Sequence, residues 1–245
     1  MTLGISGDML IAACYSFMER SPRDDFLKRV GAAAEGLGGS VSVRETRNGS
    51  AQGHTFACAF PEGKGCTTAE EAGNKIRRIA HDLNLTASGG RFAEAVFSDI
   101  IEAEAAAHGI NADAVHLHEI GRPAGLFNMA AIGLCHNLLG LGDCEIIGSA
   151  ISVGRGKTMT DHGLLTVPTP ASLHLLTGLK SRSGPFEGEM ATPTGIAIAK
   201  NLISKQIDSL PAHGRQGIGF GSKSFEGVVG YTRLFEKVEP INEGG

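Results

Sequence analysis

The chain has 245 residues, of which 42% are hydrophobic and 20% charged, and its formal net charge at pH 7 is -4. This balance is typical of a globular protein with a full core and excludes a disordered or fibrous chain. It gives no general attraction for nucleic acid or for an anionic membrane. Because no signal peptide or apolar run near 18 residues is present, we expect a cytoplasmic protein that binds neither nucleic acid nor membrane.

Glycine and cysteine usage point to loops rather than to cross-links. The 35 glycines are about twice the ~7% typical share, which indicates many tight loops close to a ligand or to each other. The five cysteines form no CxxC pair, and their odd number argues against a disulfide framework.

The first half of the chain predicts helices interrupted by one hairpin. Apolar residues at helical spacing predict helices at 8–20, 24–37, 68–85 and 91–108. Two alternating runs around Asn48-Gly49 predict a β-hairpin at 41–60. A strand normally precedes a glycine-rich turn that opens a helix, so we expect the first strand to be missing here.

The second half predicts a buried helix at 126–139, which Gly140 ends, and helices at 169–177 and 194–203. The best strand pattern is 144–153, whereas 154–170 has too many glycines and prolines to be regular. Short strands follow at 217–225 and 228–238. We therefore predict one domain with an α/β or α+β fold, in which amphipathic helices pack on a mixed sheet.

A histidine-rich segment is the first candidate site. His116 and His118 share a face if they lie on a strand, with Glu119 next to them, and Glu104 and His108 lie one helical turn apart. Convergence of the two groups would make a nitrogen and oxygen site suited to nickel, zinc, iron or copper. Alternatively, the histidines only close a helix-strand corner by hydrogen bonding.

A second candidate is His162, in a loop that also holds Arg155, Lys157 and Asp161. These side chains could hold an anionic group or a metal, with His162 as ligand or proton shuttle. The plainer interpretation is a loop histidine that caps backbone carbonyls.

Two glycine-rich segments resemble nucleotide motifs without matching them. Residues 154–158 fail the P-loop pattern because Ile151 stands where a glycine is required. Residues 217–221 lack the strand-to-helix context of a dinucleotide fingerprint, and tight turns between strands explain them equally well.

Two predicted helix starts carry polar residues. Ser6, Gly7 and Asp8 offer backbone amides and a carboxylate, which suit an anion or a metal, or simply a helix cap. Thr192 and Thr194, with Glu189 nearby, admit the same two interpretations.

Six blocks together resemble, in order and spacing, the N-terminal domain of the LarC family of nickel insertion proteins. They are GISGDM (4–9), AEAAAHG (103–109), HLHEIG (116–121), HGLLTVPTPA (162–171), GEMATPTG (188–195) and GIGFG (217–221). The resemblance covers essentially all of residues 1–245.

This resemblance implies a nickel chelatase or insertase. Such a protein places nickel into pyridinium-3,5-bisthiocarboxylic acid mononucleotide, the pincer cofactor of lactate racemase, with CTP and a manganese or magnesium ion. The matching motifs imply metal or substrate ligands at Asp8, His108, His116, His118, Glu119 and His162. They imply cofactor contacts at Ser6, Gly7, Lys157, Thr192 and Thr194.

The chain departs from the family pattern in three places. It lacks the apolar strand before GISGDM, and it lacks the smaller C-terminal domain that carries the CTP site, so we expect a separate partner chain or a homo-oligomer. Ala124 and Asn128 stand where the family has two aspartates. This loss leaves two alternatives to nickel insertion: a degenerate relative that binds metal or nucleotide or assists assembly, and a metal-dependent hydrolase using His116, His118 and His162.

Overall fold

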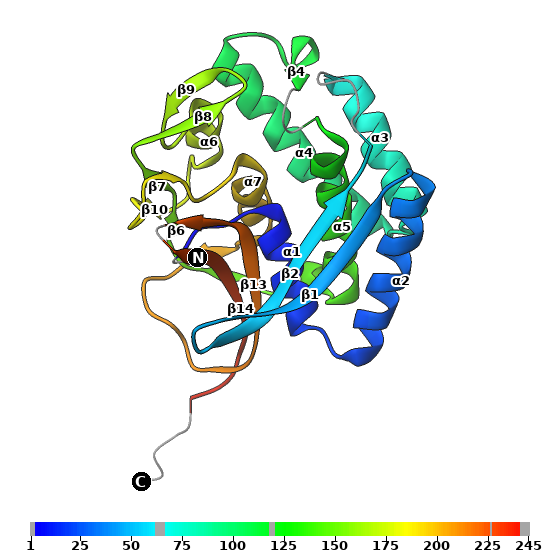
Figure 1. The fold of residues 1–245 in the computed structure, drawn as a ribbon, viewed down its shortest axis with the longest axis vertical. Coiled ribbons are helices and arrows are strands. Elements are labelled where there is room, and N and C mark those ends of the chain that lie inside the picture. The colour runs from blue at the N-terminus through cyan, green and yellow to red at the C-terminus, as the bar shows by residue number, and fades with distance from the viewer. Residues whose placement is uncertain (1–2, 62–66, 118–120, 226, 241–245) are drawn as a thin grey trace.

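The computed structural model describes residues 3–61, 67–117, 121–225 and 227–240. It confirms a mixed fold, in which helices pack around one four-stranded sheet. In Figure 1 the sheet crosses the front of the molecule, α2 and α3 lie to its right, and a group of short strands with α6 lies to its left. The α-helices are α1 (Gly7–Phe17), α2 (Arg20–Gly36), α3 (Ala69–Asp82), α4 (Ala87–His108), α5 (Pro123–Leu138), α6 (Pro170–Leu175) and α7 (Pro193–Leu202).

The main sheet has the order β1-β2-β13-β14. Its strands are β1 (Ser40–Asn48), β2 (Ala51–Ala59), β13 (His213–Phe225) and β14 (Val228–Lys237). The hairpins β1-β2 and β13-β14 are antiparallel, whereas β13 runs parallel to β2, with Gly219 opposite His54. Two hairpins from distant parts of the chain therefore meet through one parallel contact.

Short strands pair in twos around this sheet. The pairs are β3 (Thr67–Thr68) with β4 (His116–Leu117), β5 (Ile147–Gly148) with β12 (Lys205–Gln206), β6 (Ile151–Ser152) with β10 (Ser181–Arg182), β7 (Gly154–Arg155) with β11 (Gly188–Glu189), and β8 (Lys157–Thr160) with β9 (Gly163–Thr166). Ahead of α1, Ile5 forms an isolated parallel bridge with Ala191. This bridge fixes the start of α1 beside the start of α7.

Helix α1 lies between the sheet and α5, and its residues Ile11, Ala12 and Cys14 belong to the core. Two glycines of β13 let it come this close. A Cβ on Gly217 would lie 2.3 Å from the Ala13 carbonyl oxygen, and one on Gly219 would lie 1.9 Å from the Met9 carbonyl oxygen. The GIGFG block is therefore the interior of a strand packed on a helix, which confirms the strand predicted at 217–225, whereas the alternative of tight turns within the block is wrong.

Most helix boundaries follow the local signals. Thr68 and Glu71 form a capping box at the start of α3, and Gly109, in the left-handed region at φ 65°, ends α4. The predicted hairpin at Asn48-Gly49 is confirmed by its register, in which Asn48 pairs with Ala51. Helix α2 begins at Arg20, four residues earlier than predicted.

The predicted single strand at 144–153 is wrong. Only β5 and β6 form there, and each pairs with a different partner strand. Gly148 lies so close to Ile203 that a Cβ would be 2.5 Å from the Ile203 side chain, so glycine is required where β5 ends. The irregular conformation predicted for 154–170 is also wrong, because β7 and the β8-β9 hairpin occupy most of it.

Two histidines in the interior make stability depend on pH. His136 is 8% exposed and stacks on Phe92, with ring centroids 4.7 Å apart, and its Nδ1 has no hydrogen-bond partner among the described residues. Burial lowers the pKa of His136, against the opposing charge of Asp143. Burial and then the nearby Arg23 lower the pKa of His54 in the same direction.

We expect the free energy of unfolding to fall as the pH is lowered from about 7.5 to about 5.5. The unfolded chain protonates these histidines from about pH 6.5 downward, whereas the folded chain takes up the same protons only at lower pH. The stability that these two neutral histidines contribute is therefore fully present above pH 6.5 and is lost as the pH falls below it. When the free energy of unfolding, measured with urea, is plotted against pH, the slope should be smaller for His136→Gln than for the unchanged protein. The exposed control His81→Gln should leave this slope unchanged. An unchanged slope in the His136 variant would contradict this assignment.

Candidate functional site

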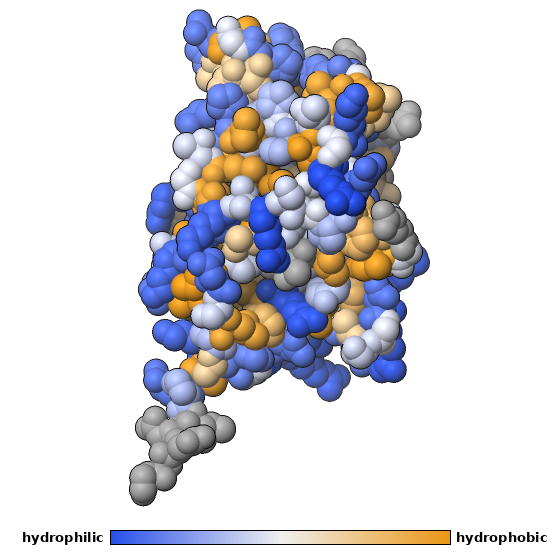
Figure 2. Space-filling view, turned by 90° about the vertical axis from the view of Figure 1, so that its left-hand side faces the viewer, coloured by the Kyte–Doolittle hydropathy of each residue, from blue (hydrophilic) through white to orange (hydrophobic). Residues whose placement is uncertain are grey.

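A cavity of about 450 Å³ opens between the starts of α1 and α7, the end of α4, the first turns of α5 and the β8-β9 hairpin. Its polar lining residues are Ser6, Asp8, Glu104, His108, Asn128, Thr160, Asp161, His162, Thr169, Glu189, Thr192, Thr194 and Lys223. Figure 2 views the molecule from the side of the short strands and shows orange apolar regions separated by blue hydrophilic side chains. The cavity brings together segments as far apart in sequence as Ser6 and Lys223.

The start of α1 forms one wall. Ser6 occupies the N-cap position with extended backbone, but its side chain makes no capping hydrogen bond; its hydroxyl donates instead to Oδ1 of Asp8. The Ser6 side chain therefore does not satisfy the first amides of α1, which carry the positive end of the helix dipole. The predicted alternative in which Ser6 simply caps this helix is wrong.

The start of α7 lies directly beside it. The hydroxyl of Thr192 accepts a hydrogen bond from the Gly195 amide at 3.2 Å, so the capping interpretation holds for this residue. Gly195 permits the close approach, since a Cβ there would lie 2.5 Å from the Ile5 carbonyl oxygen. A Cβ on Gly7 would likewise lie 3.3 Å from the Thr194 methyl group. Two helix starts thus open onto the same cavity.

The end of α4 forms the opposite wall. Nε2 of His108 lies 3.6 Å from Oε2 of Glu104, and the rings of His108 and His162 are 4.9 Å apart between centroids. Arg122, at the start of α5, forms a 3.4 Å ion pair with Asp161 in the turn of the β8-β9 hairpin. The ring contact and the ion pair hold this hairpin against the cavity and bring His162 next to His108.

Asn128, one of the two positions that depart from the family pattern, lines the cavity and contacts Cys58, which no sequence motif indicates. The single proton of the Cys58 thiol, on β2, faces two acceptors: Oδ1 of Asn128 at 3.4 Å and, further away, the Ala124 carbonyl oxygen at 3.8 Å. Burial, and then the negative charge of Asp8, raise the pKa of Cys58 to about 11. The thiol therefore keeps its proton at neutral pH. Lys223 on β13, Thr160 and Thr169 also line the cavity, and none of them was predicted as a site residue.

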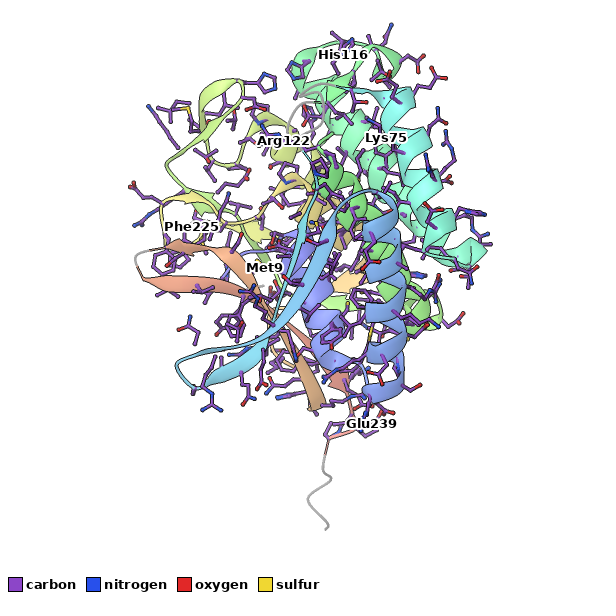
Figure 3. The ribbon with its side chains drawn as sticks, turned by 45° about the vertical axis from the view of Figure 1, so that its right-hand side comes forward. Met9, Lys75, His116, Arg122, Phe225 and Glu239 are labelled. Carbon is purple, nitrogen blue, oxygen red and sulfur yellow. The ribbon has the colours of Figure 1, made fainter. Side chains whose placement is uncertain are left out.

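Two predicted site residues lie elsewhere. His116 pairs with Thr68 in the short β3-β4 ladder and is exposed, while its buried neighbour Leu117 lines the cavity. Figure 3 shows His116 at the upper tip of the molecule, beyond Arg122. Lys157 begins β8 and is exposed, and it is not among the cavity residues. His118 and Glu119 lie outside the described residues.

The cavity contains carboxylates, imidazoles and one lysine rather than a complete metal site. In the described parts of the chain, no three histidine, cysteine, aspartate or glutamate side chains are grouped closely enough to hold a metal ion. The site can offer a cation the neighbouring imidazoles of His108 and His162, but together with Glu104 these side chains do not form a closed metal site. It can offer an anion two helix starts. Within the described residues, no helix has the length and apolar character needed to span a membrane.

Comparison with known proteins is consistent with this site. The chain matches the nickel insertion protein family over residues 1–243. It is 30% identical over 259 aligned residues to the pyridinium-3,5-bisthiocarboxylic acid mononucleotide nickel insertion protein of Staphylococcus epidermidis, covering 97% of this chain and 60% of that protein. A protein of the same name from a Nocardioides species is 35% identical over 157 residues, covering 61% of this chain and 38% of that protein.

The chain thus spans 60% or less of the length of these two relatives. No solved structure matches it. The family match extends over nearly the whole sequence and includes every segment that lines the cavity. The chain belongs to the nickel insertion protein family.

Proposed function

We propose that this chain inserts nickel into pyridinium-3,5-bisthiocarboxylic acid mononucleotide, and that the cavity holds both reactants. The observation that carries the proposal is the arrangement of two helix starts opposite a pair of imidazoles in one cavity of about 450 Å³. That volume suits a mononucleotide, since small-molecule sites commonly enclose about 300–1,000 Å³.

The helix starts would bind the phosphate of the mononucleotide. Backbone amides at a helix N-terminus, together with the helix dipole, form a ready site for a phosphate group. Ser6 and Gly7 at α1 and Thr194 at α7 are the residues that would contact it, and Lys223 supplies a positive charge on the same cavity. The pyridinium ring would then lie against the apolar lining residues Leu117 and Leu165.

Nickel enters this proposal as a substrate. His108 and His162, with Glu104 beside them, offer nitrogen and oxygen ligands that bind nickel without the tight hold of several thiolates. The thiocarboxylate sulfurs of the mononucleotide are softer ligands and would take the metal from the imidazoles. We also propose Asp8, His118 and Glu119 as nickel ligands. Leu117, which lines the cavity, immediately precedes His118.

Three further parts of the proposal come from the LarC resemblance. The first is a requirement for CTP with a manganese or magnesium ion. The second is that lactate racemase uses the product. The third is that the protein works in the cytoplasm, together with a separate partner chain or as a homo-oligomer. The proposed contact of Lys157 with the cofactor belongs to the same group, since Lys157 lies outside the cavity lining.

One alternative keeps support from a specific observation. Asn128 places a neutral amide on the cavity wall, which favours a relative that binds the mononucleotide without completing nickel insertion. A hydrolase using His116, His118 and His162 is less favoured, because His116 is exposed and is not among the cavity residues.

The nickel site is tested by the double variant His108→Ala with His162→Ala. We expect its nickel affinity to fall about tenfold or more in calorimetric titration, because both imidazole ligands are removed. The exposed control His81→Ala should bind nickel as the unchanged protein does, and melting temperatures should establish that both proteins are folded. Unchanged nickel affinity in the folded double variant would overturn the ligand assignment.

A further inference from the structure

The side-chain amide of Asn128 is held in a defined direction at the cavity wall. Asn128 lies in the second turn of α5 and is half-buried, and a Cβ placed on Gly7 of α1 would lie 3.7 Å from its Cβ. Its Oδ1 accepts the hydrogen bond of the Cys58 thiol at 3.4 Å. The residue therefore touches the cavity on one side and β2 on the other.

The protonation state of Cys58 decides which end of the amide faces the cavity. A thiol with a pKa of about 11 carries its proton at neutral pH, and it therefore acts as a hydrogen-bond donor. It pairs with the oxygen of the Asn128 amide and not with its NH2 group. The NH2 group is left at the other end, where it makes no hydrogen bond within the described residues, and Asn128 is one of the residues that line the cavity.

A neutral donor at this place favours a particular kind of ligand group. Asp8 lines the same cavity and already accepts the Ser6 hydroxyl, so the cavity lining includes both a carboxylate and an amide. An amide NH2 donates to oxygen or sulfur anions and cannot coordinate a cation. It discriminates sharply, because a buried polar group left unpaired costs about 1–3 kcal/mol.

We propose that Asn128 is a specificity-determining residue that donates its amide to a carboxylate or thiocarboxylate of a pyridinium mononucleotide, and that Cys58 is the positioning residue that orients this amide. The identity of the ligand rests on the proposed function. The direction of the amide rests on the contact between Cys58 and Asn128 alone.

The test uses two pyridinium mononucleotides that differ only at the ring substituent. Nicotinate mononucleotide carries a carboxylate, and nicotinamide mononucleotide carries a neutral carboxamide in the same position. We expect the unchanged protein to bind the nicotinate compound about tenfold more tightly in calorimetric titration, because the Asn128 amide pairs with the carboxylate. We expect Asn128→Asp to reverse this preference, since a carboxylate at position 128 repels the first ligand and accepts from the second.

Variants of Cys58 separate orientation from packing. Cys58→Ala should reduce the preference for the nicotinate compound severalfold, whereas Cys58→Ser should restore it, because a serine hydroxyl donates the same hydrogen bond. Melting temperatures of all variants check that each is folded. A preference that Asn128→Asp leaves unchanged overturns the inference while the proposed function stands, and an unchanged protein that binds neither compound overturns both.

Discussion

Replacing Gly219 with alanine is expected to lower the free energy of unfolding by about 3 kcal/mol or more, because α1 must move away from the sheet. The new Cβ would lie 1.9 Å from the Met9 carbonyl oxygen and 2.4 Å from the Ala13 nitrogen. Both are backbone atoms of one helix, so no side-chain rotation can relieve the contact. For a chain of this size the melting temperature should fall by about 6–12 °C, as calorimetry would show.

The matched control for this substitution is Gly31→Ala, on the outer side of α2. A Cβ there meets no atom within 4 Å, and Gly31 has ordinary helical geometry. Alanine is favoured over glycine inside a helix by about 0.5–1 kcal/mol, so this control should gain stability. Two identical chemical changes thus have opposite expected signs. A Gly219→Ala protein as stable as the unchanged chain would show that α1 does not rest on β13 as described.

The second large effect is expected for Asp99→Ala, which removes the polar contact between α4 and α7. One Asp99 oxygen accepts from Lys200 and the other from Asn201, each at 2.6 Å. The side chains of Lys200 and Asp99 are 34% and 17% exposed, so solvent screens the pair only partly. Without the carboxylate, the half-buried donors Lys200 and Asn201 lose this shared acceptor. We expect the free energy of unfolding, measured with denaturant, to fall by about 2 kcal/mol.

Asp208→Ala provides the comparison for an exposed pair. Lys180 and Asp208 form a 3.0 Å ion pair, but their side chains are 54% and 78% exposed. Such pairs contribute little, so the change should stay within about 0.5 kcal/mol. If both variants lowered the free energy of unfolding by the same amount, the contact between α4 and α7 would stabilise the protein no more than an exposed ion pair does. This link matters for the site, because α4 ends at His108 and α7 begins beside Thr192.

Elements with a local signal could be predicted from the sequence. Asn48-Gly49 determines its own turn, and Gly109 ends α4 through a backbone conformation that suits glycine. The segment 144–153 could not be predicted, because its apolar pattern says nothing of its partners. Whether it forms one strand or two depends on those partners, because β5 pairs with β12 and β6 with β10, both far along the chain.

The candidate site divides in the same way. The polar helix starts at Ser6 and Thr192 are visible as sequence patterns, and the cavity lies where they meet. Side chains along the strand that contains His116 and Leu117 point alternately to its two faces, and the sequence does not reveal which of these two residues faces inward. Cys58 is one residue of a hairpin until tertiary packing places it against Asn128. Contacts of this kind depend on register and packing, which no local motif records.

The close seating of α1 on Gly217 and Gly219 has a consequence for the order of assembly. Helix α1 and β13 are separated by about two hundred residues, and contacts this distant in sequence form slowly because a large loop must close. During synthesis the apolar α1 therefore lacks the strand on which it packs until His213–Phe225 has been made. The wall at Ser6 and Asp8 cannot be firmly placed before that moment. A ligand that contacts Ser6 and Asp8 would therefore bind only after β13 has been synthesised and has packed on α1. Shorter, partly synthesised chains would not bind it.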